Sequence, residues 1–89
     1  MNGVHTQERR ELVDSAARWL DETYPGWAAT IDVENFEIED PQKCVGHYLD
    51  VDWYEDLCIP FKAATGNPTG VFADEKLQEY WVEEIERRS

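Results

Sequence analysis

The chain has 89 residues, of which 20 are acidic and 8 are basic, so its net charge at neutral pH is −12. A field of this sign repels phosphate, which argues against direct binding to nucleic acid and against recruitment to an anionic membrane surface. Apolar residues make up 42% of the chain and include four tryptophans, a composition that excludes a disordered acidic tail and predicts one folded domain over residues 1–89.

The first segment predicts a flexible tail at residues 1–5 and an amphipathic helix from about residue 7 to residue 23. Thr6 can cap this helix, in which apolar residues recur at spacings of three and four. Tyr24-Pro25-Gly26 ends it, because proline disfavours helical backbone in the residue before it. The N-terminus is polar where a signal peptide would be apolar, and no apolar run reaches the roughly 18 residues of a transmembrane helix. We therefore expect a cytoplasmic protein.

The region from residue 27 to residue 49 predicts a compact loop followed by a short helix. Residues 27–40 fit neither the period of a strand nor that of a helix and leave room for one helical turn. Asp40 and Pro41 then suit the N-cap and first position of a helix over residues 41–49. Gly46 inside that helix costs up to about 1 kcal/mol relative to alanine, which indicates that a neighbouring group packs closely against it. The residues expected to be buried here are Cys44, Val45, Tyr48 and Leu49.

A third helix is predicted to follow Asp50 or Asp52, either of which can cap it. Its apolar positions lie one turn apart, at Trp53, Leu57 and Phe61, flanked by Tyr54 and Cys58. Pro60 is expected to end the helix. Residues 62–71 then form a loop before the C-terminal helix, with a turn at 66–68.

The last helix is predicted from near Asp74 to about Arg88, with an apolar stripe at Leu77, Trp81 and Ile85. The fold class that follows is a small all-α single domain. It has about four helices, two long ones at the termini and two short ones in the centre, around an aromatic core.

Most charges of the terminal helix have a local explanation. The glutamates at 83–84 precede the arginines at 87–88 by four positions, a spacing that predicts two ion pairs worth about 0.2 to 0.5 kcal/mol each. Glu75 in the first turn complements the helix dipole. Glu79 has no such local role and therefore joins the candidate acidic surface described next.

The strongest functional signal is a surplus of carboxylates between residues 32 and 56, where Lys43 is the one basic residue. Phosphates along a nucleic acid present comparable negative charge, so this surface predicts a mimic that occupies the basic groove of a nucleic-acid-binding protein. The alternative is that the charge merely keeps a small domain in solution. The candidate partner-binding residues are Asp32, Glu34, Glu37, Glu39, Asp40, Asp50, Asp52, Glu55, Asp56 and Glu79.

The sequence predicts no enzyme, no cofactor and no metal site. Cys44, His47 and Cys58, with His5, could in principle bind zinc, but a structural site usually needs two tight ligand pairs. Asp50-Val51-Asp52 loosely resembles a calcium loop and lacks the required glycine. No glycine-rich phosphate loop or nucleophile elbow is present, and both cysteines are expected to be reduced thiols rather than a disulfide.

Aromatic residues offer an alternative way of binding. Tyr24 and Trp27 flank a Pro-Gly turn, and Val71-Phe72 end a loop, so any of them could anchor an interface. Core positions are the simpler interpretation, because a domain this small needs its tryptophans inside. A self-associating structural or assembly protein remains the second hypothesis for function.

Several short motifs follow one another along most of the chain. They are Ala17-Arg18-Trp19-Leu20-Asp21-Glu22, Pro25-Gly26-Trp27, Ile31-Asp32, Cys44-Val45 with Gly46 and Tyr48, and the run Tyr80-Trp81-Val82-Glu83-Glu84-Ile85-Glu86-Arg87-Arg88. Their order and spacing resemble a group of short acidic proteins of actinobacteriophages and their actinobacterial hosts, although Gly46-His47 replaces a longer aliphatic stretch of that group. The resemblance implies a phage or prophage protein made in the bacterial cytoplasm, and it implies no catalytic residue.

These observations together predict a non-catalytic protein that binds the basic surface of a host or phage protein. The specific hypothesis is inhibition of a nucleic-acid-binding or defence protein by mimicry of phosphate charge.

Overall fold

The computed structural model describes the backbone of residues 2–88 and the side chains of residues 8–88, and it confirms a small all-α fold. The four α-helices are α1 (Asn2–Thr23), α2 (Val45–Leu49), α3 (Ile59–Thr65) and α4 (Gln78–Arg88). Shorter helical turns connect them, namely the 3-10 turns η1 (Trp27–Thr30), η3 (Thr69–Phe72) and η4 (Glu75–Leu77) and the π-helical turn η2 (Trp53–Cys58). The described chain has no β-strand.

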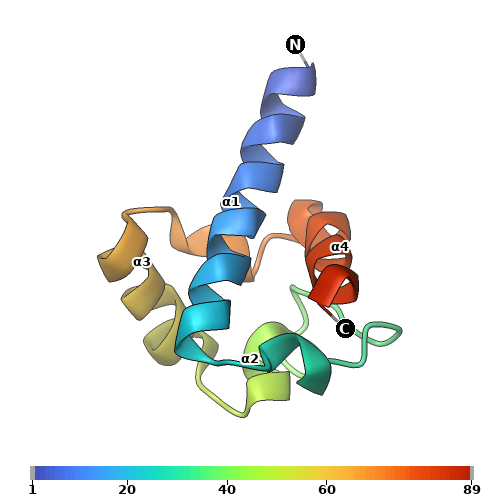
Figure 1. The fold of residues 1–89 in the computed structure, drawn as a ribbon, viewed down its shortest axis with the longest axis vertical. Coiled ribbons are helices and arrows are strands. Elements are labelled where there is room, and N and C mark those ends of the chain that lie inside the picture. The colour runs from blue at the N-terminus through green and yellow to red at the C-terminus, as the bar shows by residue number, and fades with distance from the viewer. Residues whose placement is uncertain (1, 89) are drawn as a thin grey trace.

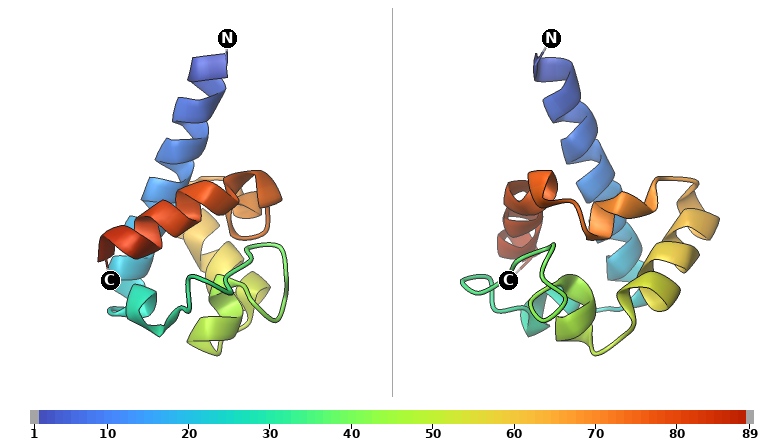
Figure 2. Two further views of the ribbon diagram at one scale, coloured as in Figure 1. Left: turned by 90° about the vertical axis from the view of Figure 1, so that its right-hand side faces the viewer. Right: turned by 180° about the vertical axis from the view of Figure 1, so that it is seen from behind.

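Helix α1 projects beyond the rest of the molecule at its N-terminal end (Figure 1) and packs on α4 along the body. It begins at Asn2, so residues 2–5 continue the helix instead of forming the predicted tail, while Met1 lies outside the described residues. No proline interrupts these positions, and Thr6 is not required as a cap. The connection from η1 to α2 runs alongside α4 (Figure 2), which brings the acidic middle of the sequence against the last helix.

The core is built from aromatic side chains, as predicted. Trp27 and Trp81 are almost fully buried and meet edge to face, with ring centroids 5.9 Å apart. Phe61 and Phe72 form a second edge-to-face pair at 5.4 Å. The indole N–H of Trp81 donates to the carbonyl of Val71 at 2.8 Å, so this buried donor is satisfied. The predicted stripe of Leu77, Trp81 and Ile85 is buried throughout.

The aromatic residues at the surface differ from those expected. Trp27, Val71 and Phe72, considered above as interface anchors, are buried, whereas Trp53 is 40% exposed. The prediction that every tryptophan lies inside was therefore wrong. Large apolar side chains are exposed at Trp53, Tyr54 and Ile59.

The second helix is shorter than predicted, because residues 41–44 form turns before α2 begins at Val45. Asp40 does accept a hydrogen bond from the Gln42 N–H, at 2.8 Å, but it caps a turn and not a helix. The carbonyl of Lys43 accepts instead from the N–H of Glu37 at 3.1 Å. This contact with the preceding loop removes an acceptor that a continuous helix over 41–49 would use.

Pro60 does not end the third helical segment, contrary to the prediction. The π-helical turn η2 runs directly into α3, which continues to Thr65 and ends at Gly66 in the left-handed conformation. Proline has no N–H for the carbonyl four residues earlier, that of Asp56. The hydroxyl of Tyr24 donates to that carbonyl at 3.2 Å. The loop predicted for residues 62–71 therefore starts only after Thr65.

Two of the predicted local contacts are confirmed. A Cβ added at Gly46 would lie 2.9 Å from the Cβ of Trp53, so the close packing expected around this glycine is present. Asp52 caps η2 by accepting from the N–H groups of Tyr54 and Glu55, each at 2.9 Å. Asp74, near which the last helix was predicted to begin, also accepts a hydrogen bond, from the Lys76 N–H at the start of η4.

Ion pairs fasten α4 to α1 in a pattern that differs in part from the prediction. Arg88 pairs with Glu84, as expected from their spacing, and also reaches Asp21 on α1 with its Nε 2.8 Å from Oδ1. Glu83 pairs with Arg10 of α1 and not with Arg87. Arg87 contacts Glu84 instead, at 3.1 Å. No helix within residues 2–88 combines the length and apolar character needed to span a membrane.

Candidate functional site

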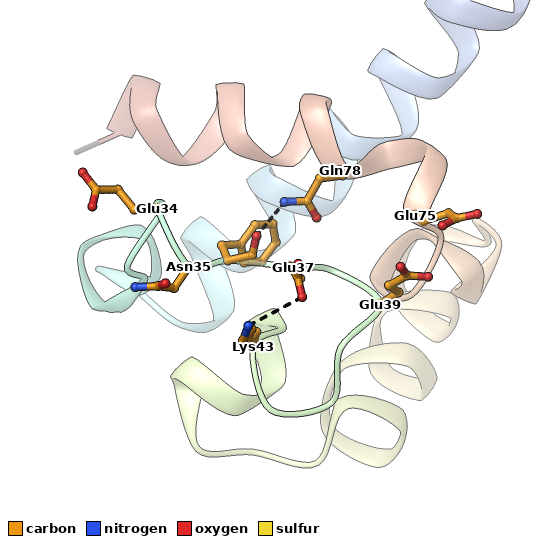
Figure 3. A pocket seen from close by; sticks show the side chains of 8 residues that line it. Glu34, Asn35, Glu37, Glu39, Lys43, Glu75 and Gln78 are labelled. Carbon is orange, nitrogen blue, oxygen red and sulfur yellow. Dashed lines mark hydrogen bonds and ion pairs between the residues drawn. The ribbon is translucent and has the colours of Figure 1, made fainter.

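A recess lined largely by carboxylates lies between the loop before α2 and the start of α4 (Figure 3). Glu39 and Glu75 converge at one end, Glu34 lies at the other, and Glu37 points toward Lys43 between them. Lys43 is 3.8 Å from Glu37 and is the one basic side chain of the lining. The complete lining is Glu34, Asn35, Phe36, Glu37, Glu39, Lys43, Glu75 and Gln78.

The amide of Gln78 holds this recess together. Its Oε1 accepts from the N–H of Ile38 and its Nε2 donates to the carbonyl of Phe36, both at 2.7 Å. The two bonds attach an irregular loop to the first turn of α4, across about 40 residues of sequence. This attachment brings Glu39 next to Glu75.

The pair formed by Glu39 and Glu75 is electrostatically unfavourable. Both side chains are exposed, and the Glu75 carboxylate is the main cause that raises the pKa of Glu39 above its ordinary value. Glu37 and Asp40 raise this pKa further. The repulsion between the two carboxylates therefore disfavours the ionised form of Glu39.

A second recess lies where α2 meets η2 and contains three aspartates. Asp52 and Asp56 have structural roles there, because Asp52 caps η2 and the Asp56 Oδ2 accepts from the Asp52 N–H at 2.9 Å. Asp50 ends α2 in the left-handed conformation, with φ of 57°. The lining is Pro41, Cys44, Gly46, His47, Asp50, Val51, Asp52, Trp53 and Asp56.

An apolar slot of about 210 Å³ separates the two acidic recesses. It shares Glu39 with the first recess and shares Pro41, Cys44 and Trp53 with the second, so the three form one continuous surface. We call this surface the acidic face. The slot itself is lined by Ile38, Glu39, Pro41, Cys44, Trp53, Phe72 and Ala73.

The acidic face contains six of the ten predicted binding residues, namely Glu34, Glu37, Glu39, Asp50, Asp52 and Asp56. The other four do not line these recesses. Asp32 accepts from the Glu34 N–H and the Asn35 side chain, and Asp40 caps the turn at 41–43, so both shape the loop. Glu55 and Glu79 are exposed elsewhere on their elements.

Three residues of the acidic face were missed by the sequence analysis. Glu75 was explained by the helix dipole, Trp53 was placed in the core, and Gln78 gave no signal. The sequence held one clue to the position of Trp53. A glycine that is expected to pack closely implies that the backbone or Cβ of a neighbouring residue lies against the short helix. Glu75 and Gln78 become recognisable only once the loop is docked on α4.

The basic side chains are mostly engaged elsewhere. Four arginines pair with acids of the two terminal helices, in the combinations Arg10–Glu83, Arg18–Asp14, Arg87–Glu84 and Arg88–Asp21 with Glu84. None of these acids belongs to the acidic face. The positive charge of the chain therefore stabilises the contact between α1 and α4 and leaves the acidic face largely uncompensated.

The cysteines are buried free thiols and lie apart from any group of metal ligands. Burial is the main cause that raises the pKa of the Cys58 thiol to about 11, with a smaller contribution from Asp52. Such a thiol is a poor nucleophile at neutral pH. Among the side chains of residues 8–88, no three His, Cys, Asp or Glu residues are grouped so as to hold a metal ion. His5 lies outside this range.

Comparison with protein-family models, with curated proteins and with solved structures finds no match for this chain. A function therefore has to be inferred from the chemistry of the acidic face. That face combines exposed carboxylates with one apolar slot and the exposed side chain of Trp53.

Proposed function

We propose that the chain is a non-catalytic binding protein whose acidic face docks on the basic surface of another protein. The observation that carries this proposal is the Glu39–Glu75 pair. Both carboxylates are exposed, neither is ion-paired among the side chains of residues 8–88, and the Gln78 amide attaches the loop that carries Glu39 to the start of α4. A lysine or arginine of a partner placed between the two carboxylates would relieve their repulsion. The free energy that this repulsion costs the folded protein would then favour binding.

The alternative is that the negative charge serves solubility alone, and it does not explain why Glu39 and Glu75 lie close together. Solubility requires net charge but not close approach of like charges, which destabilises the free protein. Several other acids have local structural roles, as shown by Asp32, Asp40, Asp52 and Asp56. Glu34, Glu39 and Glu75 show no comparable capping role, which supports their assignment to partner binding.

The partner that we propose is a host or phage protein that itself binds nucleic acid or acts in defence, inhibited in the bacterial cytoplasm by competition for its basic groove. The excess of carboxylates on one face supports a mimic of phosphate charge. The resemblance to short acidic proteins of actinobacteriophages supports a bacterial host as the source of the partner.

The direct test is capture of a partner from actinobacterial lysate at about 0.05 M and about 0.5 M salt. We expect the partner to be recovered at low salt and lost at high salt, because exposed charges are screened within a few ångströms at the higher concentration. Recovery of the same protein in equal amount at both concentrations contradicts the proposal.

A matched pair of charge reversals locates the binding surface. Glu39→Lys should weaken binding to the captured partner by about 10-fold at low salt, whereas Glu22→Lys, the same charge change on an exposed residue of α1, should change it by less than about 2-fold. Titration calorimetry with both variants measures this difference. Equal weakening by the two variants would show that only net charge matters and would remove the acidic face as the site.

Self-association is the second candidate, and the exposed side chains of Trp53, Tyr54 and Ile59 are the observation in its favour. The residues first considered for this role, Trp27 and Phe72, are buried and cannot supply it. Contact between two copies of the acidic face would also oppose like charges. Sedimentation velocity tests this candidate, which predicts a dimer that becomes more stable as salt increases. A monomer at high protein and high salt concentration excludes it.

A further inference from the structure

We infer that the apolar slot of the acidic face receives a single bulky apolar side chain from a partner segment in which lysine or arginine flanks that side chain on both sides. This inference rests on the proposed function and specifies the chemistry of the bound segment. It follows from the size of the slot, the fixed position of its walls and the charges on its two sides.

The size of the slot suits one side chain. Its volume of about 210 Å³ is below the roughly 300 to 1,000 Å³ of pockets for small-molecule ligands. Its floor is formed by Ile38, Cys44 and Phe72, which are nearly fully buried, while Trp53 and Ala73 stand exposed around it. Apart from Glu39 the lining is apolar, so an aliphatic or aromatic side chain is the matching occupant.

The walls are held in place before any partner binds. The ring of Phe72 contacts Phe61 and Trp81 in the core, so the floor cannot collapse into the slot. The Cβ of Trp53 fits against the space left by Gly46, and the Asp52 cap fixes the turn that carries Trp53. A preformed slot requires little ordering on binding, which favours affinity.

The carboxylates beside the slot determine which residues are favoured on either side of the apolar anchor in the bound segment. Glu39 and Glu75 lie on one side of the slot, and Asp50, Asp52 and Asp56 lie on the other. A chain that inserts one side chain must cross carboxylates in both directions, so positive residues before and after the anchor are favoured.

A second copy of this chain does not meet these requirements. Its exposed apolar residues Tyr54 and Ile59 stand beside Glu55 and Asp56, which would meet like charge at the acidic face. The occupant that we propose is therefore a basic segment of a different protein.

Three capped pentapeptides test the inference. They are Lys-Lys-Leu-Lys-Lys, the same peptide with a central alanine, and Glu-Glu-Leu-Glu-Glu. We expect the leucine peptide to bind about 10-fold more tightly than the alanine peptide, because the leucine side chain buries more apolar surface in the slot, although part of it stays exposed. The acidic peptide should not bind. Affinity is measured by calorimetry, and fluorotryptophan labelling should show the Trp53 fluorine signal shifting with the leucine peptide.

Two variants of the slot and one matched control complete the test. Ala73→Leu fills the slot from an exposed position and should reduce the preference for leucine to less than about 2-fold while leaving binding of the alanine peptide unchanged. Trp53→Ala removes one wall, retains the Cβ that packs on Gly46, and should also reduce the preference. Ile59→Ala removes an exposed apolar side chain that does not line the slot and should leave it intact.

The outcomes separate this inference from the proposed function. Equal, salt-sensitive binding of the leucine and alanine peptides would overturn the role of the slot and leave the electrostatic proposal standing. A leucine preference that survives both Ala73→Leu and Trp53→Ala would also overturn the slot assignment. Binding of neither basic peptide at about 1 mM, together with capture of a partner that resists high salt, would overturn both.

Discussion

The folded structure disfavours the ionised form of the Glu39 side chain. Its pKa is raised above the ordinary value of 4.5, chiefly by the neighbouring Glu75 carboxylate. In the pH range just above that value the native protein therefore binds more protons than the unfolded chain. Under this condition the free energy of unfolding falls as pH rises, which is the reverse of the usual behaviour of an ion-paired carboxylate.

Replacement of Glu39 by glutamine tests this electrostatic cost. Glu39→Gln should raise the melting temperature at pH 7, because the amide removes the repulsion from Glu75, and should change it little at pH values well below 4.5, where the wild-type side chain is already neutral. Thermal unfolding followed by circular dichroism at both pH values measures the difference. Glu22→Gln is the control and should have no pH-dependent effect, whereas a lower melting temperature of Glu39→Gln at pH 7 would contradict the repulsion.

If the same substitution also weakens partner binding, stability and function are opposed at this position. Such opposition is common at binding sites, since charges placed for a partner have no compensation in its absence. Replacement of an acid that caps a helical turn, such as Asp52, should by contrast reduce the stability of the free protein. The sign of the stability change on replacement can therefore distinguish an acid that is placed for a partner from an acid that caps local structure.

Several local signals in the sequence predicted caps and contacts correctly. The cap at Asp52 and the glycine contact at Gly46 depend on residues within a few positions, and the structure confirms both. The prediction was wrong at residues 41–44 and at Pro60. In both places a group distant in sequence or on another segment supplies the deciding hydrogen bond, from Glu37 in one case and from Tyr24 in the other.

The candidate site shows the same division between local and distant information. The carboxylates at 34, 37 and 39 were recognisable from composition, and so were those at 50, 52 and 56. Glu75 joins them only because Gln78 bonds the backbone of a loop about 40 residues away. No periodicity or motif encodes that contact, so the recess and the slot could not be predicted from the sequence.

The junction of η2 and α3 depends on Tyr24, and this dependence can be measured. Tyr24→Phe keeps the edge contact with Trp19 but removes the donor to the Asp56 carbonyl, which should reduce the free energy of unfolding by about 1 kcal/mol. In a Pro60→Ala background the alanine N–H can donate to the same carbonyl, so the cost of Tyr24→Phe should be smaller there.

Urea denaturation of the wild type, the two single variants and the double variant gives the coupling energy. Strictly additive effects would show that the tyrosine does not substitute for the donor that proline lacks. Burial, with a smaller effect of Asp56, raises the pKa of Tyr24, so the hydroxyl remains a donor throughout the neutral range.

The whole molecule is closed by contacts between its first and last helices. Arg88, near the C-terminal end, donates from Nε and Nη2 to Asp21 across 67 positions of sequence and lies over the ring of Trp27. Its Nη1 also bonds Glu84, whose side chain is only 3% exposed. The indole N–H of Trp27 donates to Asp21 at 2.8 Å and completes the network. The arginines thus hold the two terminal helices together and do not neutralise the acidic face.

Removal of Arg88 should destabilise the whole domain. Arg88→Met leaves the buried Glu84 with only Arg87 as a cationic partner and should reduce the free energy of unfolding by about 2 to 4 kcal/mol, as for other buried carboxylates that lose a partner. Arg18→Met is the matched control, because Arg18 forms an exposed pair with Asp14, and it should cost less than about 1 kcal/mol. Urea denaturation at pH 7 measures both, and equal losses would show that the network contributes no more than a surface ion pair.

The effect of Arg88→Met should also depend on pH, with a sign set by Asp21. The Arg88 hydrogen bond is the main cause that lowers the pKa of Asp21 below its ordinary value of 3.8. The stabilisation from this pair is therefore fully present above that value and is lost as pH falls through the lower pKa of the folded state. The gap in melting temperature between wild type and Arg88→Met should consequently be larger at pH 7 than near pH 3. A gap that stays constant would contradict a charge-dependent contribution of the Arg88–Asp21 pair.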